Sequence, residues 1–205
     1  MTLSCVIGTV FRNFAIISGD MRMSNSDEIT SEKTSKVFKV NNKVLVGMTG
    51  SAQPVITLKE NGYFSLEDCP SAEDYFEFLW LLTGNKQVIQ QNQSNVLVIG
   101  VSKEGIGFGG NFHMDDEMLN NQLYISEKLD GWSPILTPPS VNQKYYQKVI
   151  DNRIIEIVLS QTNIQNFSRG MLIKNIKELH REIILEISKK DKSVNSNIEQ
   201  HVIKW

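Results

Sequence analysis

The sequence predicts an α+β fold in which mostly antiparallel sheets are sandwiched between pairs of helices. The first observation is the order of the elements: strand-like segments, two helical segments, more strands, two more helices and a last strand. The second is an apolar stripe over residues 172–187 with charged residues on the opposite face, which is typical of a helix that covers a sheet. The third is that no repeat or linker-like stretch divides the 205 residues. We therefore expect residues 1–205 to form a single domain.

The first block predicts a β-hairpin followed by a loop. Residues 4–11 (SCVIGTVF) are rich in β-branched and aromatic side chains, and residues 14–18 repeat that pattern after the turn residues Arg12-Asn13. Gly19-Asp20 is expected to end the second strand. Residues 24–33 (SNSDEITSEK) are polar and predict a loop.

The next block predicts a second strand pair and two helices. Strands at 36–40 and 43–49 flank the turn residues Asn41-Asn42. A helical pattern begins at Ala52 and stops at Gly62, and a second one runs from Ser71 to Leu82. Ser71 is well suited to the N-cap of that second helix.

The second half of the chain begins with the clearest buried strand, residues 95–101 (NVLVIGV), with which residues 106–112 can pair. Beyond it the sequence predicts an acidic irregular stretch, two helices and a strand: 113–134, about 141–159, a periodic helix capped by Ser168, and 198–204.

Composition excludes several classes of protein. The net charge is −2 with both signs interleaved, so nucleic-acid and membrane partners are not expected. Two cysteines are too few for a disulfide framework, and with no signal peptide and no apolar run of membrane-spanning length we expect a cytoplasmic protein. His113, His180 and His201 are too scattered for a metal site, and no Walker-type phosphate loop is present, so no cofactor is expected.

Three segments carry a resemblance to a known family. They are FRNFAIISGDMRMSN (residues 11–25), SKVFKVNNKVLVGMTGSAQ (35–53) and KKDKSVNSNIEQHVI (189–203). In order and spacing they resemble the proteasome β-type peptidases, which are N-terminal-nucleophile (Ntn) hydrolases and include bacterial ring forms such as the HslV and Anbu groups. The resemblance implies the Ntn-hydrolase fold, a four-layer αββα sandwich of antiparallel sheets flanked by helix pairs.

The resemblance also implies a catalytic set. Asp20 and Asp191 would be the two carboxylates, Lys36 the central lysine, and Gly50 the donor of an oxyanion-hole N–H. The family's spacing from Asp20 to the nucleophile falls on Ser4.

Thr2 is the alternative nucleophile, because removal of Met1 alone would expose it. Thr2 could serve only if the first strand absorbed two extra residues, for instance in a bulge. Cys5 is expected on the other face of that strand, as a small core residue rather than a nucleophile.

The chemistry explains why these residue types are needed. A chain whose first residue is Ser or Thr carries its own general base, an α-amine with a pKa of about 8. A buried lysine held between Asp20 and Asp191 would stay charged and lower the pKa of the hydroxyl. An oxyanion-hole N–H would stabilise the tetrahedral intermediate.

The chain departs from the family pattern at three places. Leu3 precedes Ser4 where self-processing members usually place glycine. Pro138-Pro139-Ser140 stands where the family has a Gly-Ser-Gly turn, and Val194-Asn195 stands where many members have Ser-Gly. Ser140 or Ser193 could replace the supporting serines of the family.

A substrate pocket is implied by the resemblance at positions that would favour a hydrophobic side chain before the scissile bond: Met23, Thr34, Phe38, Met48 and Ala52. Plain core packing is the alternative interpretation of these residues.

The first functional hypothesis is a peptidase that forms an acyl-enzyme inside a homo-oligomeric ring. Its substrates would be peptides or unfolded proteins, and any ATP-dependent unfoldase that serves it would be a separate chain. The alternatives are a catalytically silent ring or binding subunit with an unprocessed N-terminus, and an Ntn amidohydrolase acting on a small amide.

Overall fold

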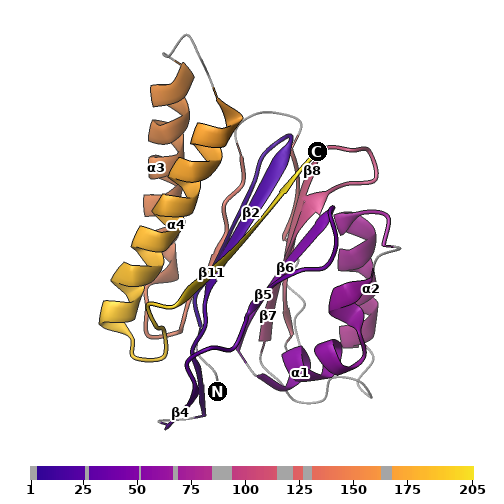
Figure 1. The fold of residues 1–205 in the computed structure, drawn as a ribbon, viewed down its shortest axis with the longest axis vertical. Coiled ribbons are helices and arrows are strands. Elements are labelled where there is room, and N and C mark those ends of the chain that lie inside the picture. Colours follow the sequence, from indigo (N-terminus) through magenta and orange to yellow (C-terminus); the bar gives the residue numbers. More distant parts are fainter. Residues whose placement is uncertain are drawn as a thin grey trace.

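The computed structural model describes residues 4–25, 28–50, 52–66, 69–84, 94–114, 122–126, 131–162 and 168–205. These residues form an α+β structure with two larger antiparallel sheets, one two-stranded sheet, four α-helices and a short 3-10 helix (Figure 1). Thr2 lies outside the described residues, and the side chain of Ala52 is not described.

The first sheet joins the two ends of the chain. Its strands lie in the order β10 (Ile135–Leu136), β1 (Val6–Val10), β2 (Phe14–Asp20) and β11 (Ile198–Lys204), and all neighbours are antiparallel. The predicted N-terminal hairpin and last strand are confirmed. The hairpin's second strand runs on through Asp20, because Asp20 pairs with Ile198, the first residue of β11.

The second sheet contains five antiparallel strands in chain order: β5 (Val37–Lys39), β6 (Val44–Gly50), β7 (Ser94–Val101), β8 (Gly107–Met114) and β9 (Gln122–Ser126). The first four strands match the predicted ones. The fifth corrects the expectation of an irregular stretch over 113–134, because residues 122–126 pair with β8. Its short run QLYIS gives too few alternations to stand out between acidic neighbours.

The polar segment predicted as a loop over 24–33 forms a small two-stranded sheet. β3 (Met23–Asn25) and β4 (Glu28–Ser31) pair with a register shift between Met23 and Ser24. The Ile29 side chain is about half exposed, at 51%. Backbone pairing, rather than a buried apolar face, makes this sheet, which is why hydrophobic patterning did not predict it.

The helices lie where periodicity predicts them. They are α1 (Ala52–Glu60), α2 (Ala72–Gly84), α3 (Gln143–Thr162) and α4 (Arg169–Lys190), with a 3-10 turn η1 (Tyr63–Ser65) after Gly62. None of the described helices is long and apolar enough to cross a membrane.

Two predicted helix caps have different outcomes. Ser71 caps α2, because its Oγ accepts the Asp74 N–H at 3.0 Å. Ser168 precedes α4 but makes no capping hydrogen bond with its side chain, which corrects the prediction. Its carbonyl oxygen instead accepts the N–H groups of Met171 and Leu172.

Three apolar clusters explain why both faces of the central strands are buried. One cluster packs β1 and β2 against α3 and α4, and a second packs the five-stranded sheet against α1 and α2 (Figure 1). A third includes Val6, Val10, Ile17, Leu45 and Leu97 and joins the two sheets. Alternation along β1 therefore sends side chains to the helices and to the other sheet in turn.

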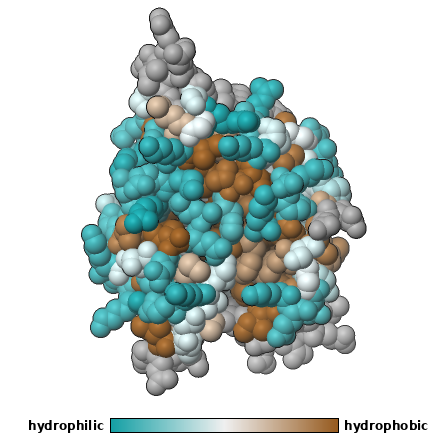
Figure 2. Space-filling view, viewed as in Figure 1, coloured by the Kyte–Doolittle hydropathy of each residue, from teal (hydrophilic) through white to brown (hydrophobic). Residues whose placement is uncertain are grey.

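The sheets approach closely at Gly47. A Cβ at Gly47 would lie 2.5 Å from Cγ1 of Val6, so no larger residue fits without movement of the neighbouring strand. The outside is different in kind: the face in Figure 2 is mostly hydrophilic, with separate hydrophobic patches.

Candidate active site

The ends of β2 and β5 bring a carboxylate and an amine together in the interior. Asp20 ends β2, and Lys36 directly precedes β5. Lys36 Nζ lies 2.9 Å from Asp20 Oδ2, and the two side chains are 6% and 0% exposed. A charged pair this deeply buried is expensive to desolvate, so its presence calls for a structural or functional reason.

Backbone N–H groups hold the carboxylate of Asp20 in place. Cys5 N–H donates to Oδ1 at 2.8 Å, and Arg22 N–H donates to Oδ2 at 3.0 Å. The Asp20 N–H in turn donates to the Cys5 carbonyl at 3.1 Å. The carboxylate therefore receives two backbone N–H donors and one ammonium donor, which favours its ionised form.

Burial and pairing act in opposite directions on the ionisation of this pair. Burial raises the pKa of Asp20 and lowers the pKa of Lys36, and the attraction between the two opposes both shifts. A weakly solvated lysine with one fixed partner is the kind of group that can stabilise a nearby developing anion.

Ser4 is joined to this pair through the backbone of the next residue. It precedes Cys5, whose N–H and carbonyl both bind Asp20, and its side chain is only 2% exposed. Cys5 is fully buried in the cluster that faces α3 and α4, and burial raises the pKa of its thiol. The expectation that Cys5 is a core residue is confirmed.

Gly50 ends β6, which pairs with β5, the strand that directly follows Lys36. It pairs with Ser94 and has a φ of 100°, in the region that favours glycine. Two residues before it, the Met48 N–H donates to the Lys36 carbonyl at 2.9 Å. The ends of β6 and of the Lys36 segment are therefore fixed relative to each other.

Asp191 lies at the end of α4 and is held by two serines. Ser140 donates to Oδ2, and Ser193 binds Oδ1 through its N–H at 2.7 Å and through its hydroxyl. Burial alone would raise the pKa of Asp191, but the hydrogen bonds from Ser140 and Ser193 together lower it. Both serines considered as replacements for the family's supporting serines thus contact Asp191.

One expected contact differs from the structure. We expected Lys36 between two carboxylates, but in the described residues its ion pair is with Asp20 and it has none with Asp191. The carboxylate of Asp191 instead accepts hydrogen bonds from Ser140 and Ser193.

The residues of the implied substrate pocket have different environments. Met23 and Thr34 are partly exposed, and the Thr34 N–H donates to the Met21 carbonyl at 2.8 Å. Phe38 stacks on Phe64 with ring centroids 4.0 Å apart, at the border of the core beside α1 and α2. Met48 is 1% exposed within that core, which matches the packing alternative for this residue.

The sequence did not point to a further network beside the pair. Arg22 forms an ion pair with Glu32 at 2.9 Å, and Asn195 donates to the same carboxylate at 2.7 Å. Asn195 stands at one of the departures from the family pattern.

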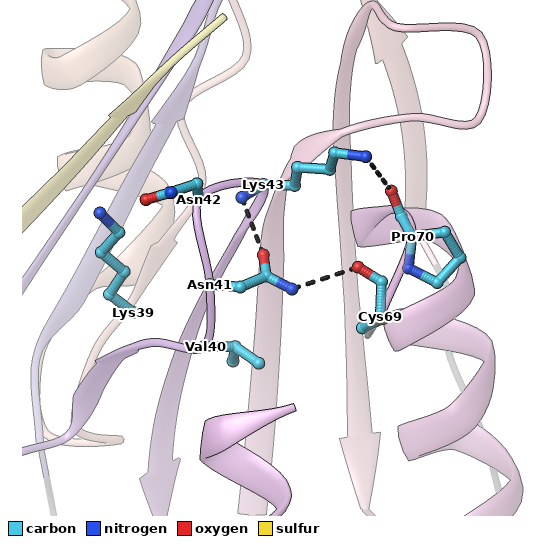
Figure 3. A pocket seen from close by; sticks show the side chains of 7 residues that line it. All are labelled: Lys39, Val40, Asn41, Asn42, Lys43, Cys69 and Pro70. Atoms are coloured by element: carbon cyan, nitrogen blue, oxygen red, sulfur yellow. Dashed lines mark hydrogen bonds between the residues drawn. The ribbon is translucent and has the colours of Figure 1, made fainter. Parts of the chain in front are cut away.

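A separate cavity of about 550 Å³ lies around the turn between β5 and β6 (Figure 3). Lys39, Asn41, Lys43 and Cys69 are among its lining residues. Because Lys36 precedes β5 and Gly50 ends β6, the turn that joins these strands lies at their other end, away from the ion pair. Among the described residues, no group of three or more His, Cys, Asp or Glu side chains could hold a metal ion.

Comparison with known proteins bears on the same part of the chain. The family model for proteasome subunits matches residues 2–65, the segment that contains Ser4, Asp20, Lys36 and Gly50. Over these residues, less than a third of the chain, the sequence is similar to proteasome subunits. A search of curated proteins finds no match.

Proposed function

We propose that this chain is a proteasome-like Ntn hydrolase that cleaves peptide bonds through an acyl-enzyme. The observation that carries the proposal is the buried Asp20–Lys36 ion pair beside the backbone that follows Ser4, within the segment that matches the proteasome family. We further propose that residues 1–205 form one domain with the four-layer αββα arrangement of Ntn hydrolases. The three apolar clusters support that arrangement.

In the proposed mechanism, cleavage of the chain frees the α-amine of the nucleophile. Ser4 is the nucleophile that we favour, and Thr2 is the alternative. The free amine accepts the hydroxyl proton as the oxygen attacks the substrate carbonyl. The C–N bond then breaks, the amine product leaves with that proton, and water hydrolyses the resulting ester to release the acid and restore the hydroxyl.

The remaining residues act on charge. Lys36 lowers the pKa of the attacking hydroxyl, and Asp20 keeps Lys36 protonated. The Gly50 N–H donates to the oxyanion, a contact whose loss typically raises the barrier by about 2.7–4 kcal/mol. Asp191 acts from the loop after α4, through the hydroxyls of Ser140 and Ser193 that it orders.

The substrate is proposed to be a peptide or an unfolded protein with a hydrophobic residue before the scissile bond. Met23, Thr34 and Phe38 are the residues that we assign to this pocket. Met48 and Ala52 belong to the same proposed set. Proteasome family members form rings, so we propose a homo-oligomer with enclosed sites, and any ATP-dependent unfoldase would be a separate chain.

We also propose a cytoplasmic location. Neither Cys5 nor Cys69 forms a disulfide, which fits a reducing compartment.

A second candidate is a catalytically silent subunit that supports a ring or binds a partner. Two observations favour it: Leu3, not glycine, precedes Ser4, and the Ser4 side chain is 2% exposed. In that state no free amine lies beside the hydroxyl, and the Asp20–Lys36 pair serves stability alone.

Replacement of Lys36 tests whether peptide cleavage depends on this side chain, as the proposed mechanism requires. Lys36→Ala and the longer Lys36→Met should abolish turnover of a hydrophobic fluorogenic peptide, whereas Lys39→Ala, an exposed lysine three residues away, should leave it unchanged. Circular dichroism checks that each variant is folded. Undiminished turnover by a folded Lys36 variant would refute the mechanism.

Intact mass and N-terminal sequencing of the active preparation decide between the two candidates. A chain that begins at Ser4 or Thr2 supports the hydrolase. A chain that retains Met1 and turns over no peptide supports the silent subunit.

A further inference from the structure

Glu32 lies where three segments of the proposed site meet. We propose that Glu32, together with Arg22 and Asn195, forms a clasp that fixes the loop after α4 against the end of β2, and so sets the position of Asp191 relative to the Asp20–Lys36 pair. The clasp is these three residues. This inference rests on the proposed function, and it makes Glu32 a positioning residue that touches neither Lys36 nor Asp20.

The first half of the clasp ties Glu32 to the end of β2. Arg22 Nη2 lies 2.9 Å from Glu32 Oε1, and Arg22 Nε donates to Oε2 at 3.2 Å, so the guanidinium binds the carboxylate at two points. The backbone N–H of the same Arg22 donates to Asp20. A shift of Arg22 would therefore move a hydrogen bond of the buried pair.

The second half ties Glu32 to the loop after α4. Asn195 Nδ2 donates to Glu32 Oε2 at 2.7 Å and to the Glu32 carbonyl at 3.1 Å, and Asn197 Nδ2 donates to that carbonyl at 3.1 Å. Arg22 Nη1 donates to the carbonyl of Lys192, the residue after Asp191. Asn195 is 4% exposed, so these hydrogen bonds of its amide are made in the interior rather than on the surface.

The same amide also reaches the end of β2. Asn195 Oδ1 accepts the Met21 N–H at 3.1 Å, and the Met21 carbonyl accepts the Thr34 N–H at 2.8 Å. A glycine at position 195 could make none of these side-chain contacts. The departure from the family pattern at Val194-Asn195 therefore has a structural role in this chain, as a partner of Glu32.

Charge adds a second effect to the geometry. The hydrogen bond from Asn195 and the contact with Arg22 lower the pKa of Glu32, so it is ionised at neutral pH and neutralises Arg22. The charged or ionisable groups acting on Lys36 are Asp20, Cys5 and Arg22, and the positive charge of Arg22 lowers the pKa of Lys36. Removal of the Glu32 charge would leave Arg22 unneutralised and lower the pKa of Lys36 further.

The test compares Glu32→Ala, Glu32→Gln and Asn195→Ala with Glu104→Ala, an exposed glutamate on the turn between β7 and β8. Hydrogen exchange of the full chain should become at least tenfold faster at the Met21, Thr34 and Val194 amides in the clasp variants and stay unchanged in Glu104→Ala. The Met21 N–H keeps a second acceptor in the Asn197 carbonyl, so a clasp variant loosens this corner without removing every hydrogen bond there.

Two further measurements distinguish a role of Glu32 in positioning the active site from a role in local stability alone. Titration of Lys36 Nζ by NMR should show a lower pKa in Glu32→Gln and a higher one in Arg22→Gln, opposite shifts that general loosening would not produce. In the active enzyme, Glu32→Ala should lower kcat by about 10- to 100-fold with little change in KM, because misplacement by about 1 Å can have an effect of that size. The double variant with Asn195→Ala should add little, since both residues belong to one clasp.

The outcomes are distinct. Unchanged exchange in Glu32→Ala overturns the clasp. Faster exchange with unchanged kcat, or with the same Lys36 shift in both charge variants, overturns the positioning role. If the wild-type chain turns over no peptide, the proposed function fails, whereas exchange and Lys36 titration still decide whether the clasp exists and acts on the pair.

Discussion

Replacement of Asp20 by asparagine should destabilise the protein strongly, and the effect should shrink at high pH. Oδ1 of Asp20 binds the Cys5 N–H, and Oδ2 binds the Arg22 N–H and Lys36. Asparagine has a single acceptor oxygen, so its NH2 group would face a donor on one side. The ammonium of Lys36 would also lose its counter-charge while its side chain stays 6% exposed. Breaking a buried pair from one side typically destabilises by about 3–5 kcal/mol.

The protonation of Lys36 sets an upper limit on this effect. With a reference pKa of about 10.4 and about 1.36 kcal/mol per pKa unit, removing the proton at pH 7 costs about 4.6 kcal/mol, and at pH 9 about 1.9 kcal/mol. In the variant the folded-state pKa of Lys36 lies below its unfolded value. The unfolded state then binds more protons, so the stability of Asp20→Asn rises with pH relative to wild type.

Urea unfolding followed by tryptophan fluorescence measures this difference. The free energy of unfolding is compared at pH 7 and pH 9 for wild type and variant, at one fixed protein concentration because assembly would shift it. Glu182→Gln is the control, since it breaks an ion pair with Arg153 whose side chains are 51% and 46% exposed. We expect that control to lose less than about 1 kcal/mol. A loss below about 1 kcal/mol for Asp20→Asn at pH 7, or an equal loss at both pH values, would refute the reasoning.

Two further predictions use the same unfolding measurement. His180 is fully buried between the hydroxyls of Thr9 and Ser18, each 2.8 Å from a ring nitrogen, and burial lowers its pKa to about 3. The unfolded state therefore binds the extra proton as the pH falls through 6.5, so stability should fall on acidification. Between pH 6.5 and 4.5 the wild type should lose about 2.3 kcal/mol more than His180→Gln, and equal slopes would contradict this. Ser71→Ala should lose about 1 kcal/mol because a helix cap is removed. Ser168→Ala, which removes no capping hydrogen bond, should lose almost nothing, and equal losses would argue against the capping account.

The parts of the fold that were predicted are those in which burial leaves a periodic trace in the sequence. The stripe over residues 172–187 became the buried face of α4, and the hairpin and last strand became the first sheet. The strands that were missed, β3, β4, β9 and β10, lie at the margins, and backbone pairing rather than apolar alternation holds β3 and β4. Backbone hydrogen bonds do not require apolar side chains at regular positions, so they leave no hydrophobic pattern in the sequence.

The candidate site divides in the same way. The contact between Asp20 and Lys36 followed from family spacing, although Asp20 ends β2 in the first sheet and Lys36 directly precedes β5 in the second. Glu32 and Asn195 are 163 residues apart in sequence, and their side chains are ordinary surface types. Only the folded structure brings them together. The environment of Asp191 was partly predicted, since Ser140 and Ser193 were recognised as replacements but its separation from Lys36 was not.

The pairing of β2 with β11 determines when this site can form during folding. Asp20 lies opposite Ile198, so the strand that carries the carboxylate is completed only by a strand that is synthesised long after it, beyond α4. Contacts of such long sequence separation close late and slow the folding of a chain. Until β11 arrives, β2 is an unpaired edge, and a newly made chain would be open there to pairing with other strands. Arrival of β11, rather than formation of the hairpin, should therefore be the event after which Asp20 and Lys36 are shielded from water together.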